Sequence, residues 1–305
     1  MERQGTVTRT TGLWYEVDCD GLLLNCRIRG RLRLKGVRST NPVVVGDRVK
    51  VSDDGRGEWS IDDIEPRRNY VIRRASNLSK ESHIIAANID RALLVVTLHS
   101  PATPVEFVDR FLVTCEAYKI PVTILLAKCD LCDEQPEAMR DFEAVYSSAG
   151  YRVLRVSALR GDGVDDVAAM MSVGTTLLSG NSGVGKSTLV RAICPEIEIR
   201  TGEISESHHK GRHTTTFSTM YTLPSGGRVI DTPGIKGFGL IDIDDAELWH
   251  YFPEMLERGA ACRFYNCTHT HEPGCAVAEA VASGEIAESR YVSYLKMMED
   301  DEKYR

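Results

Sequence analysis

A glycine-rich segment that ends in lysine and serine is the part of this sequence best suited to chemistry. The residues GNSGVGKST fit the spacing G-x-x-x-x-G-K-[ST] and stand between an apolar, strand-like stretch and a helix-like one. Glycines let the backbone close around phosphate oxygens, and amide groups at a helix start donate to them. The segment therefore predicts a phosphate-binding loop, made of Gly180, Asn181, Ser182, Gly183, Val184, Gly185, Lys186, Ser187 and Thr188. The alternative is a glycine-rich turn that binds nothing.

Two side chains of this loop can act on a bound nucleotide together with a second motif, DTPG. Lys186 can neutralise the β- and γ-phosphates, and the Ser187 hydroxyl can take one Mg²⁺ position. Asp231 begins DTPG and ends an apolar stretch, where its carboxylate can hold Mg²⁺ directly or through water. The amide of Gly234 can then face the γ-phosphate. Alone, DTPG is an ordinary turn, but behind a phosphate loop it predicts a nucleotide-sensing segment.

The segment GRHTTTF lies between these two motifs. One threonine hydroxyl there can complete the Mg²⁺ shell when γ-phosphate is present. The spacing allows Thr214, Thr215 or Thr216, and we place Thr215 in this role. Alternatively, the three threonines reflect β-propensity ahead of the next strand.

A base-recognition site is predicted by AKCD and SAL. A carboxylate at Asp130 can accept hydrogen bonds from N1–H and the 2-amino group of guanine. Adenine would leave this carboxylate unpaired, at a cost of about 1–3 kcal/mol, so GTP is favoured over ATP. The stem of Lys128 can cover the base, and the backbone around Ala158 can donate to O6. The expected set is Ala127, Lys128, Cys129, Asp130, Ser157, Ala158 and Leu159. Ala127 is a departure, because Asn or Thr is usual there.

The order of the motifs is unusual. An ordinary GTPase has its phosphate loop first and its base-recognition motifs last, whereas here AKCD and SAL precede the phosphate loop and DTPG. This order predicts a circular permutation. The chain after DTPG is then connected directly to the segment that senses the γ-phosphate.

A second kind of site is predicted near the end of the chain by C-x4-C-x-H-x5-C. Its members are Cys262, Cys267, His269 and Cys275. Three thiolates and an imidazole suit tetrahedral Zn²⁺, and four protein ligands leave no open position, which indicates a structural role. His271 is the alternative histidine ligand. Cys129 and Cys132 also form a CxxC, but no second pair lies nearby, and we interpret it as chance.

The elements that must position these residues fall into three predicted domains. Residues 1–72 contain about five short strand patterns, typical of a small barrel such as the oligonucleotide-binding fold. After a polar connector at 73–82, residues 73–238 alternate buried strands with helical stretches, typical of a doubly wound α/β domain. Residues 239–305 combine the Cys/His cluster with helical patterns, and no strand pattern returns.

Composition narrows the class of protein. With 42% hydrophobic and 27% charged residues the chain is predicted to be globular, and the longest apolar stretch is too short to cross a bilayer. We expect a cytoplasmic protein that does not associate with a membrane. A monomer is the default expectation. Nine cysteines in such a chain favour metal ligation over a disulfide framework.

Charge is distributed unevenly. The net charge is −7, yet the segment from Cys26 to Thr40 has six basic residues and no acid. Five of them alternate along the sequence, so one face of a strand would carry Arg27, Arg29, Arg31, Arg33 and Lys35. This face can follow an RNA backbone, or it is simply a solvated barrel face. Trp14 and Tyr15 can stack on bases, or pack in the barrel core.

With these motifs in this order, the chain resembles the circularly permuted, ribosome-associated GTPase family RsgA (YjeQ). The strings PVVVGDRV, IAANID, GRHTTT and EPGCAV, and the domain order, extend the resemblance over nearly the whole chain. The resemblance implies an oligonucleotide-binding-fold domain, a permuted GTPase and a zinc domain. It also implies that the small ribosomal subunit, with its rRNA, is the partner and stimulates hydrolysis of GTP to GDP during late subunit maturation.

The resemblance also suggests a catalytic residue. Ras-like enzymes place a water-orienting Gln after DxxG, but here Ile235 follows Gly234. In the similar family the histidine of GxHTTT is proposed for this task, which implies His213 here; otherwise His213 is an exposed loop residue. Two other functions stay open: a nucleotide-gated RNA-binding module with negligible hydrolysis, and a P-loop ATPase that acts on RNA.

Overall fold

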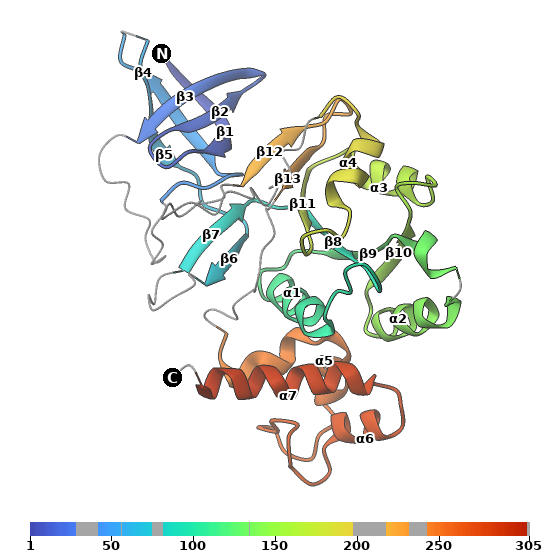
Figure 1. The fold of residues 1–305 in the computed structure, drawn as a ribbon. Helices are drawn as coiled ribbons and strands as arrows, with labels where there is room; N and C mark the ends of the chain where they lie inside the picture. Colours follow the sequence, from blue (N-terminus) through green and yellow to red (C-terminus); the bar gives the residue numbers. More distant parts are fainter. Residues whose placement is uncertain are drawn as a thin grey trace, which may run out of the picture.

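The computed structural model describes residues 1–28, 42–55, 57–74, 82–133, 135–197, 218–231 and 243–303. They form an amino-terminal barrel, a central α/β sheet and a carboxy-terminal group of helices (Figure 1). The fold confirms the predicted class: a β-barrel, a P-loop α/β domain with permuted motif order, and a mostly helical part that carries the Cys/His cluster. The domain limits at 72 and 238 stay predictions.

The barrel is a closed ring of five strands in the order β1-β2-β3-β5-β4, with β4 paired back to β1. It closes because alternate residues of each strand are apolar and point inwards. Val7, Val17, Val49, Val51 and Ile61 are fully buried at its centre. The strands are β1 Glu2–Thr10, β2 Tyr15–Cys19, β3 Leu22–Ile28, β4 Arg48–Asp53 and β5 Trp59–Ile64.

A separate two-stranded antiparallel sheet follows the barrel. Its strands are β6 (Tyr70–Arg74) and β7 (Ser82–Ala87). The predicted connector at 73–82 therefore begins within β6 and ends within β7. The two strands are held together because Ile72 pairs with Ile84 and packs against buried Val44. Gly46 permits the close contact with the barrel: its φ is +92°, and a Cβ there would lie 2.0 Å from the Ala87 carbonyl oxygen.

The central sheet continues in the order β10-β9-β8-β11-β13-β12, parallel except for β12. Successive residues of a strand point to opposite faces. Leu94 and Val96 of β8 pack with α1 and α2, whereas Leu93 and Val95 pack with α3 and α4. Helix α3 was not predicted. The elements are β8 Arg91–Val96, α1 Val105–Ala117, β9 Val122–Ala127, η1 Cys129–Cys132, α2 Pro136–Ser148, β10 Arg152–Val156, α3 Val164–Met171, β11 Thr175–Ser179, α4 Lys186–Ile193, β12 Thr219–Thr222 and β13 Arg228–Asp231.

The barrel and the central sheet are joined edge to edge. Strand β1 pairs antiparallel with β12 at Arg9 and Thr219, which makes one sheet of eleven strands. Thr219 in turn pairs with Asp231 of β13. Arg9, Thr219 and Asp231 therefore lie side by side on β1, β12 and β13, and this row connects the barrel to the start of DTPG.

The carboxy-terminal helices pack on the outer side of α1 (Figure 1). Leu248, Phe252, Met255 and Tyr294 form their core, to which Val113 of α1 also contributes. The elements are η2 Asp245–Tyr251, α5 Pro253–Gly259, α6 Ala276–Ala282 and α7 Glu288–Lys303. Within the described parts of the chain, the helices are too short or too polar to cross a membrane.

Candidate nucleotide-binding site and metal centre

The phosphate loop connects β11 to α4 at the carboxyl end of the sheet. Gly180 has a φ of +148°, and a Cβ at this position would lie 2.3 Å from the Val95 carbonyl oxygen, so only glycine fits. Gly183 and Gly185 also have positive φ, and α4 begins at Lys186. The loop thus surrounds a helix start, which is a favourable place for phosphate oxygens.

Lys186 is held inside this loop. Its Nζ donates to the carbonyl oxygens of Gly180 at 2.7 Å and Asn181 at 2.9 Å. Burial lowers the pKa of its ammonium group, and the nearby Asp231 carboxylate opposes that shift. The cation is therefore fixed at the loop where a polyphosphate would add negative charge.

Asp231 lies beside the phosphate loop because β13 pairs with β11, with Leu178 opposite Asp231. Burial raises the pKa of this carboxyl group, and Lys186 partly opposes the shift. Its Oδ1 atom is buried and has no hydrogen-bond partner among the described residues. An unpaired buried carboxylate oxygen suits a hard cation such as Mg²⁺, and the Ser187 hydroxyl, in the first turn of α4, could supply a second oxygen.

Asp130 lies in the short helix η1 that follows β9, where its carboxylate is held by a neighbouring loop. The Ser157 hydroxyl donates to its Oδ1 at 2.7 Å, and the Arg160 amide donates to the Ser157 hydroxyl at 3.1 Å. The Arg160 guanidinium reaches back to the Asp130 carbonyl oxygen at 3.3 Å and pairs with Asp133. Leu159 is 82% exposed at the tip of this loop. The structure thus brings AKCD and SAL together.

Lys128 connects the base loop to the phosphate loop. Its backbone is left-handed, with φ 56° and ψ 38°, and its Nζ donates to the carbonyl oxygens of Ser100 at 2.5 Å and Gly183 at 2.8 Å. These contacts form because β8 lies between β9 and β11. The neighbouring Ala127 packs its methyl group in an apolar cluster. Lys128 thereby joins the two loops without a polar side chain at 127.

The remaining predicted nucleotide residues lie outside the part of the chain that the structure describes. They are His213, Thr214, Thr215, Thr216 and Gly234. Their roles stay predictions.

The Cys/His cluster lies in the segment between α5 and α6. Its four ligand atoms lie within 4.8 Å of one another. His269 Nδ1 is 3.5 Å from Cys262 Sγ and 3.4 Å from Cys275 Sγ, and these two sulfurs are 4.0 Å apart. Ligands at about 2.0–2.3 Å from a tetrahedral ion lie roughly 3.3–3.8 Å apart. The two His269 contacts match this spacing and the sulfur pair is slightly wider, so the group could hold a metal ion such as zinc. His271 is exposed and its Nδ1 contacts Thr270 instead.

Hydrogen bonds from α7 fix the loop that carries His269. Tyr291 donates to the His269 carbonyl oxygen at 2.6 Å, and Tyr294 donates to that of Thr268 at 2.5 Å. Trp249 packs edge-on against the His269 ring, with centroids 4.6 Å apart. The last helix therefore positions the loop that carries His269.

Of the predicted basic strand face, only Arg27 lies in the described part of the chain. Its guanidinium stacks on Trp14, 4.1 Å from the ring centroid. Trp14 is 41% exposed, whereas Tyr15 is buried in the barrel core. Core packing therefore accounts for Tyr15, while Trp14 and Arg27 stay at the surface.

Family models match most of the chain. The model for the RsgA N-terminal domain matches residues 4–61, and the model for the RsgA GTPase matches residues 64–241. The chain belongs to the RsgA GTPase family. This membership confirms the family resemblance and the enzyme class, a GTP hydrolase.

Relatives in the RsgA family match over the full length. Two proteins named "Small ribosomal subunit biogenesis GTPase RsgA" come from Bacteroides fragilis (strain YCH46) and Porphyromonas gingivalis (strain W83). The first is 52% identical, covering 99% of both chains. The second is 53% identical, covering 99% of this chain and 98% of the relative.

Two solved structures have a similar fold. YjeQ from Thermotoga maritima has a TM-score of 0.78 at 33% identity, covering 98% of each chain. YloQ, described as a circularly permuted GTPase, has a TM-score of 0.75 at 28% identity, covering 100% of this chain and 96% of YloQ. The permuted motif order read from this RsgA-family sequence is thus confirmed.

Sequence reasoning missed two contributors to the nucleotide site. Ser100 follows β8 and contacts Lys128, and Arg160 supports Ser157 and Asp130. A serine and a proline a few residues beyond a buried strand indicate a loop at the carboxyl edge of the sheet. Only the strand order shows that this loop lies between the base loop and the phosphate loop.

Proposed function

We propose that this RsgA-family chain binds the small ribosomal subunit and hydrolyses GTP to GDP and phosphate during late assembly of that subunit. Full-length relatives named for small-subunit biogenesis support the partner. The same relatives and the ribosomal partner favour a cytoplasmic factor, and we expect a monomer.

The observation that carries the nucleotide preference is the fixed Asp130 carboxylate. Ser157 holds it at 2.7 Å, and Lys128 joins its loop to the phosphate loop. A carboxylate fixed beside the phosphate loop matches the two donors on guanine and leaves adenine without a match. The geometry therefore supports GTP over ATP.

In the proposed reaction Lys186 binds the β- and γ-phosphates and stabilises the charge that develops between them. Ser187, Asp231 and Thr215 would hold Mg²⁺, which supplies further positive charge to the phosphates. The Gly234 amide contacts the γ-phosphate and reports its presence to the chain that follows.

His213 is the residue we propose to position the hydrolytic water. The residue after Gly234 is Ile235, which has no polar group to orient water. A nearby imidazole can accept a hydrogen bond from water at neutral pH. We place this role in the subunit-bound protein.

The cluster of Cys262, Cys267, His269 and Cys275 is proposed to hold one structural Zn²⁺. Four protein ligands complete a tetrahedral shell and leave no position for a reacting water. The ion would stabilise the small group of carboxy-terminal helices.

The proposed rRNA contact lies on the barrel. Arg27 stacked on the exposed Trp14 offers a cation and an aromatic face, both suited to single-stranded RNA. The alternating basic residues that follow Arg27 in the sequence would add phosphate contacts.

The test is steady-state phosphate release from GTP and from ATP, each with and without purified small subunits, at matched Mg²⁺ and salt. Strong stimulation by the subunit with GTP alone supports the proposal. Equal use of ATP would favour an RNA-dependent ATPase. GTP binding without turnover in either condition would favour a nucleotide-gated RNA-binding module.

A further inference from the structure

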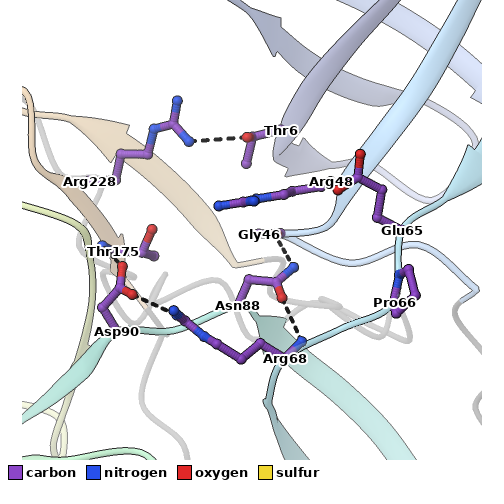
Figure 2. A pocket seen from close by; sticks show the side chains of 10 residues that line it. All are labelled: Thr6, Gly46, Arg48, Glu65, Pro66, Arg68, Asn88, Asp90, Thr175 and Arg228. Carbon is purple, nitrogen blue, oxygen red and sulfur yellow. Dashed lines mark hydrogen bonds and ion pairs between the residues drawn. The ribbon is translucent and has the colours of Figure 1, made fainter.

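A polar pocket of about 170 Å³ lies between the barrel and the central sheet (Figure 2). It has room for about five waters, which is ample for a tetrahedral phosphate group. Both bodies contribute to its wall: Thr6 and Arg48 come from the barrel, and Thr175 and Arg228 come from β11 and β13. Arg68 and Asn88 come from the segments that link the two bodies.

The pocket is distinct from the phosphate loop. Thr175 and Arg228 are the first residues of their strands, whereas the phosphate loop and Asp231 stand at the opposite ends. A five-residue strand spans roughly 16 Å, so the two sites are separated by about that distance. A ligand in this pocket would not compete directly with a nucleotide.

Three guanidinium groups line the pocket, and they differ in how they are paired. Arg68 pairs with Asp90 at 2.6 Å. Arg228 has a long contact of 3.7 Å to Asp18 and donates to the Thr6 hydroxyl at 3.1 Å. Arg48 forms no ion pair with the described residues, and its side chain extends across the pocket between Arg228 and Asn88 (Figure 2).

The acidic groups that line the pocket do not neutralise the Arg48 guanidinium. Asp90 is occupied by Arg68 and by the Thr175 amide, at 2.7 Å. Glu65 lines the wall on the side from which Arg48 enters, away from the guanidinium end (Figure 2). Arg48 and Arg228 therefore point like charges into a shared space, an arrangement that an anion between them would stabilise.

We propose that this pocket is a binding site for one phosphate group, carried as inorganic phosphate or as a phosphate monoester. Arg48 and Arg228 bind its oxygens through their planar forks, and the Thr6 hydroxyl donates a further hydrogen bond. The bound anion joins the barrel to the first residue of β13. The proposal does not depend on GTP hydrolysis or on the ribosomal partner.

The test uses the full chain with saturating GDP and Mg²⁺, so that the phosphate loop is filled. Inorganic phosphate and glycerol 3-phosphate are titrated separately against chloride at constant ionic strength, and the melting temperature is recorded. We expect a saturable rise with at least one of them, and the tighter ligand identifies the source. Arg48→Gln should weaken that binding about tenfold, because it removes a charge-assisted contact.

Lys50→Gln is the matched control. Lys50 is two residues further along the same face of β4, outside the pocket, and its removal changes the net charge equally. Its binding should equal that of the unaltered protein. Arg48→Lys keeps the charge but loses the fork, so it should weaken binding several-fold and gives a result even where Arg48→Gln does not fold. No saturable binding, or equal weakening by Lys50→Gln, would overturn the proposal.

Discussion

The Arg290 guanidinium donates to the Asp109 carboxylate at 2.7 Å and so joins the last helix, α7, to the first helix of the GTPase sheet, α1. The same guanidinium donates to Glu254 of α5, also at 2.7 Å, and lies over the Phe252 ring. Arg290 is 1% exposed and Asp109 is fully buried. The helical part is thus fixed on the central domain by ion pairs that exclude water.

Arg290→Met should strongly destabilise the docked helices. The change leaves the two buried carboxylates without their cation, which costs about 3–5 kcal/mol. Urea unfolding, monitored by far-UV circular dichroism, measures this loss of stability. Arg258→Met is the control, because Arg258 and Glu285 form an exposed pair worth about 0–1 kcal/mol. Equal losses in the two variants would contradict the assigned role of the buried network.

Asp130→Asn should change the base preference from guanine to xanthine. An amide still accepts from N1–H but donates where guanine also donates, so GDP affinity should fall roughly tenfold to a hundredfold. Xanthine has a carbonyl oxygen at that position, so XDP should bind the variant better than GDP. Titration with fluorescent GDP and XDP measures both affinities. Asp133→Asn, which alters an exposed carboxylate nearby, should keep the GDP preference.

Asp231→Asn should stabilise the nucleotide-free protein at neutral pH while weakening Mg²⁺-dependent GTP binding. Burial raises the pKa of Asp231, so the folded protein binds a proton there more readily than the unfolded chain does. Its stabilising contribution is fully present below the unfolded carboxyl pKa and is lost as pH rises through the raised pKa. Melting temperatures from pH 4 to 8 should converge for the two proteins at the acidic end. A variant that melts lower at neutral pH would contradict this account.

Cys275→Ala should remove the metal and unfold the small helical part. Zinc ligation contributes on the order of 10 kcal/mol to such sites. Metal analysis of the purified protein should give one zinc per chain before the change and none after it. Cys194→Ala alters another buried thiol, which packs against α3 and α4, and should keep the zinc. Stoichiometric zinc in Cys275→Ala would show that the ligand set is wrong.

Local patterns predicted most of the fold. In α1, for example, Val108, Phe111, Leu112 and Cys115 repeat at helical spacing and are all buried. The five barrel strands and the Cys/His group were likewise encoded within short windows. The hairpin β6–β7 was missed because its polar strand ends read as a connector.

Contacts between distant segments were beyond the same reasoning. Nothing in the sequence near Arg290 indicates that its partner is Asp109, and nothing near Arg9 indicates that β1 pairs with β12. Such pairings depend on how whole elements pack. In the candidate site, residue types were readable from motifs, whereas the supporting contacts of Lys128 and Arg160 required the strand order.

The pairing of β1 with β12 has a consequence for the order of folding. The barrel strands span residues 2–64, and even the pairing of β1 with β4 falls within this span, so the barrel can close early in synthesis. Its first strand must then wait for Thr219 to emerge before the eleven-stranded sheet is complete. Until that point β1 keeps an open edge where β12 will add. The newly made chain therefore passes through a stage in which a finished barrel is tethered to an unfinished catalytic sheet.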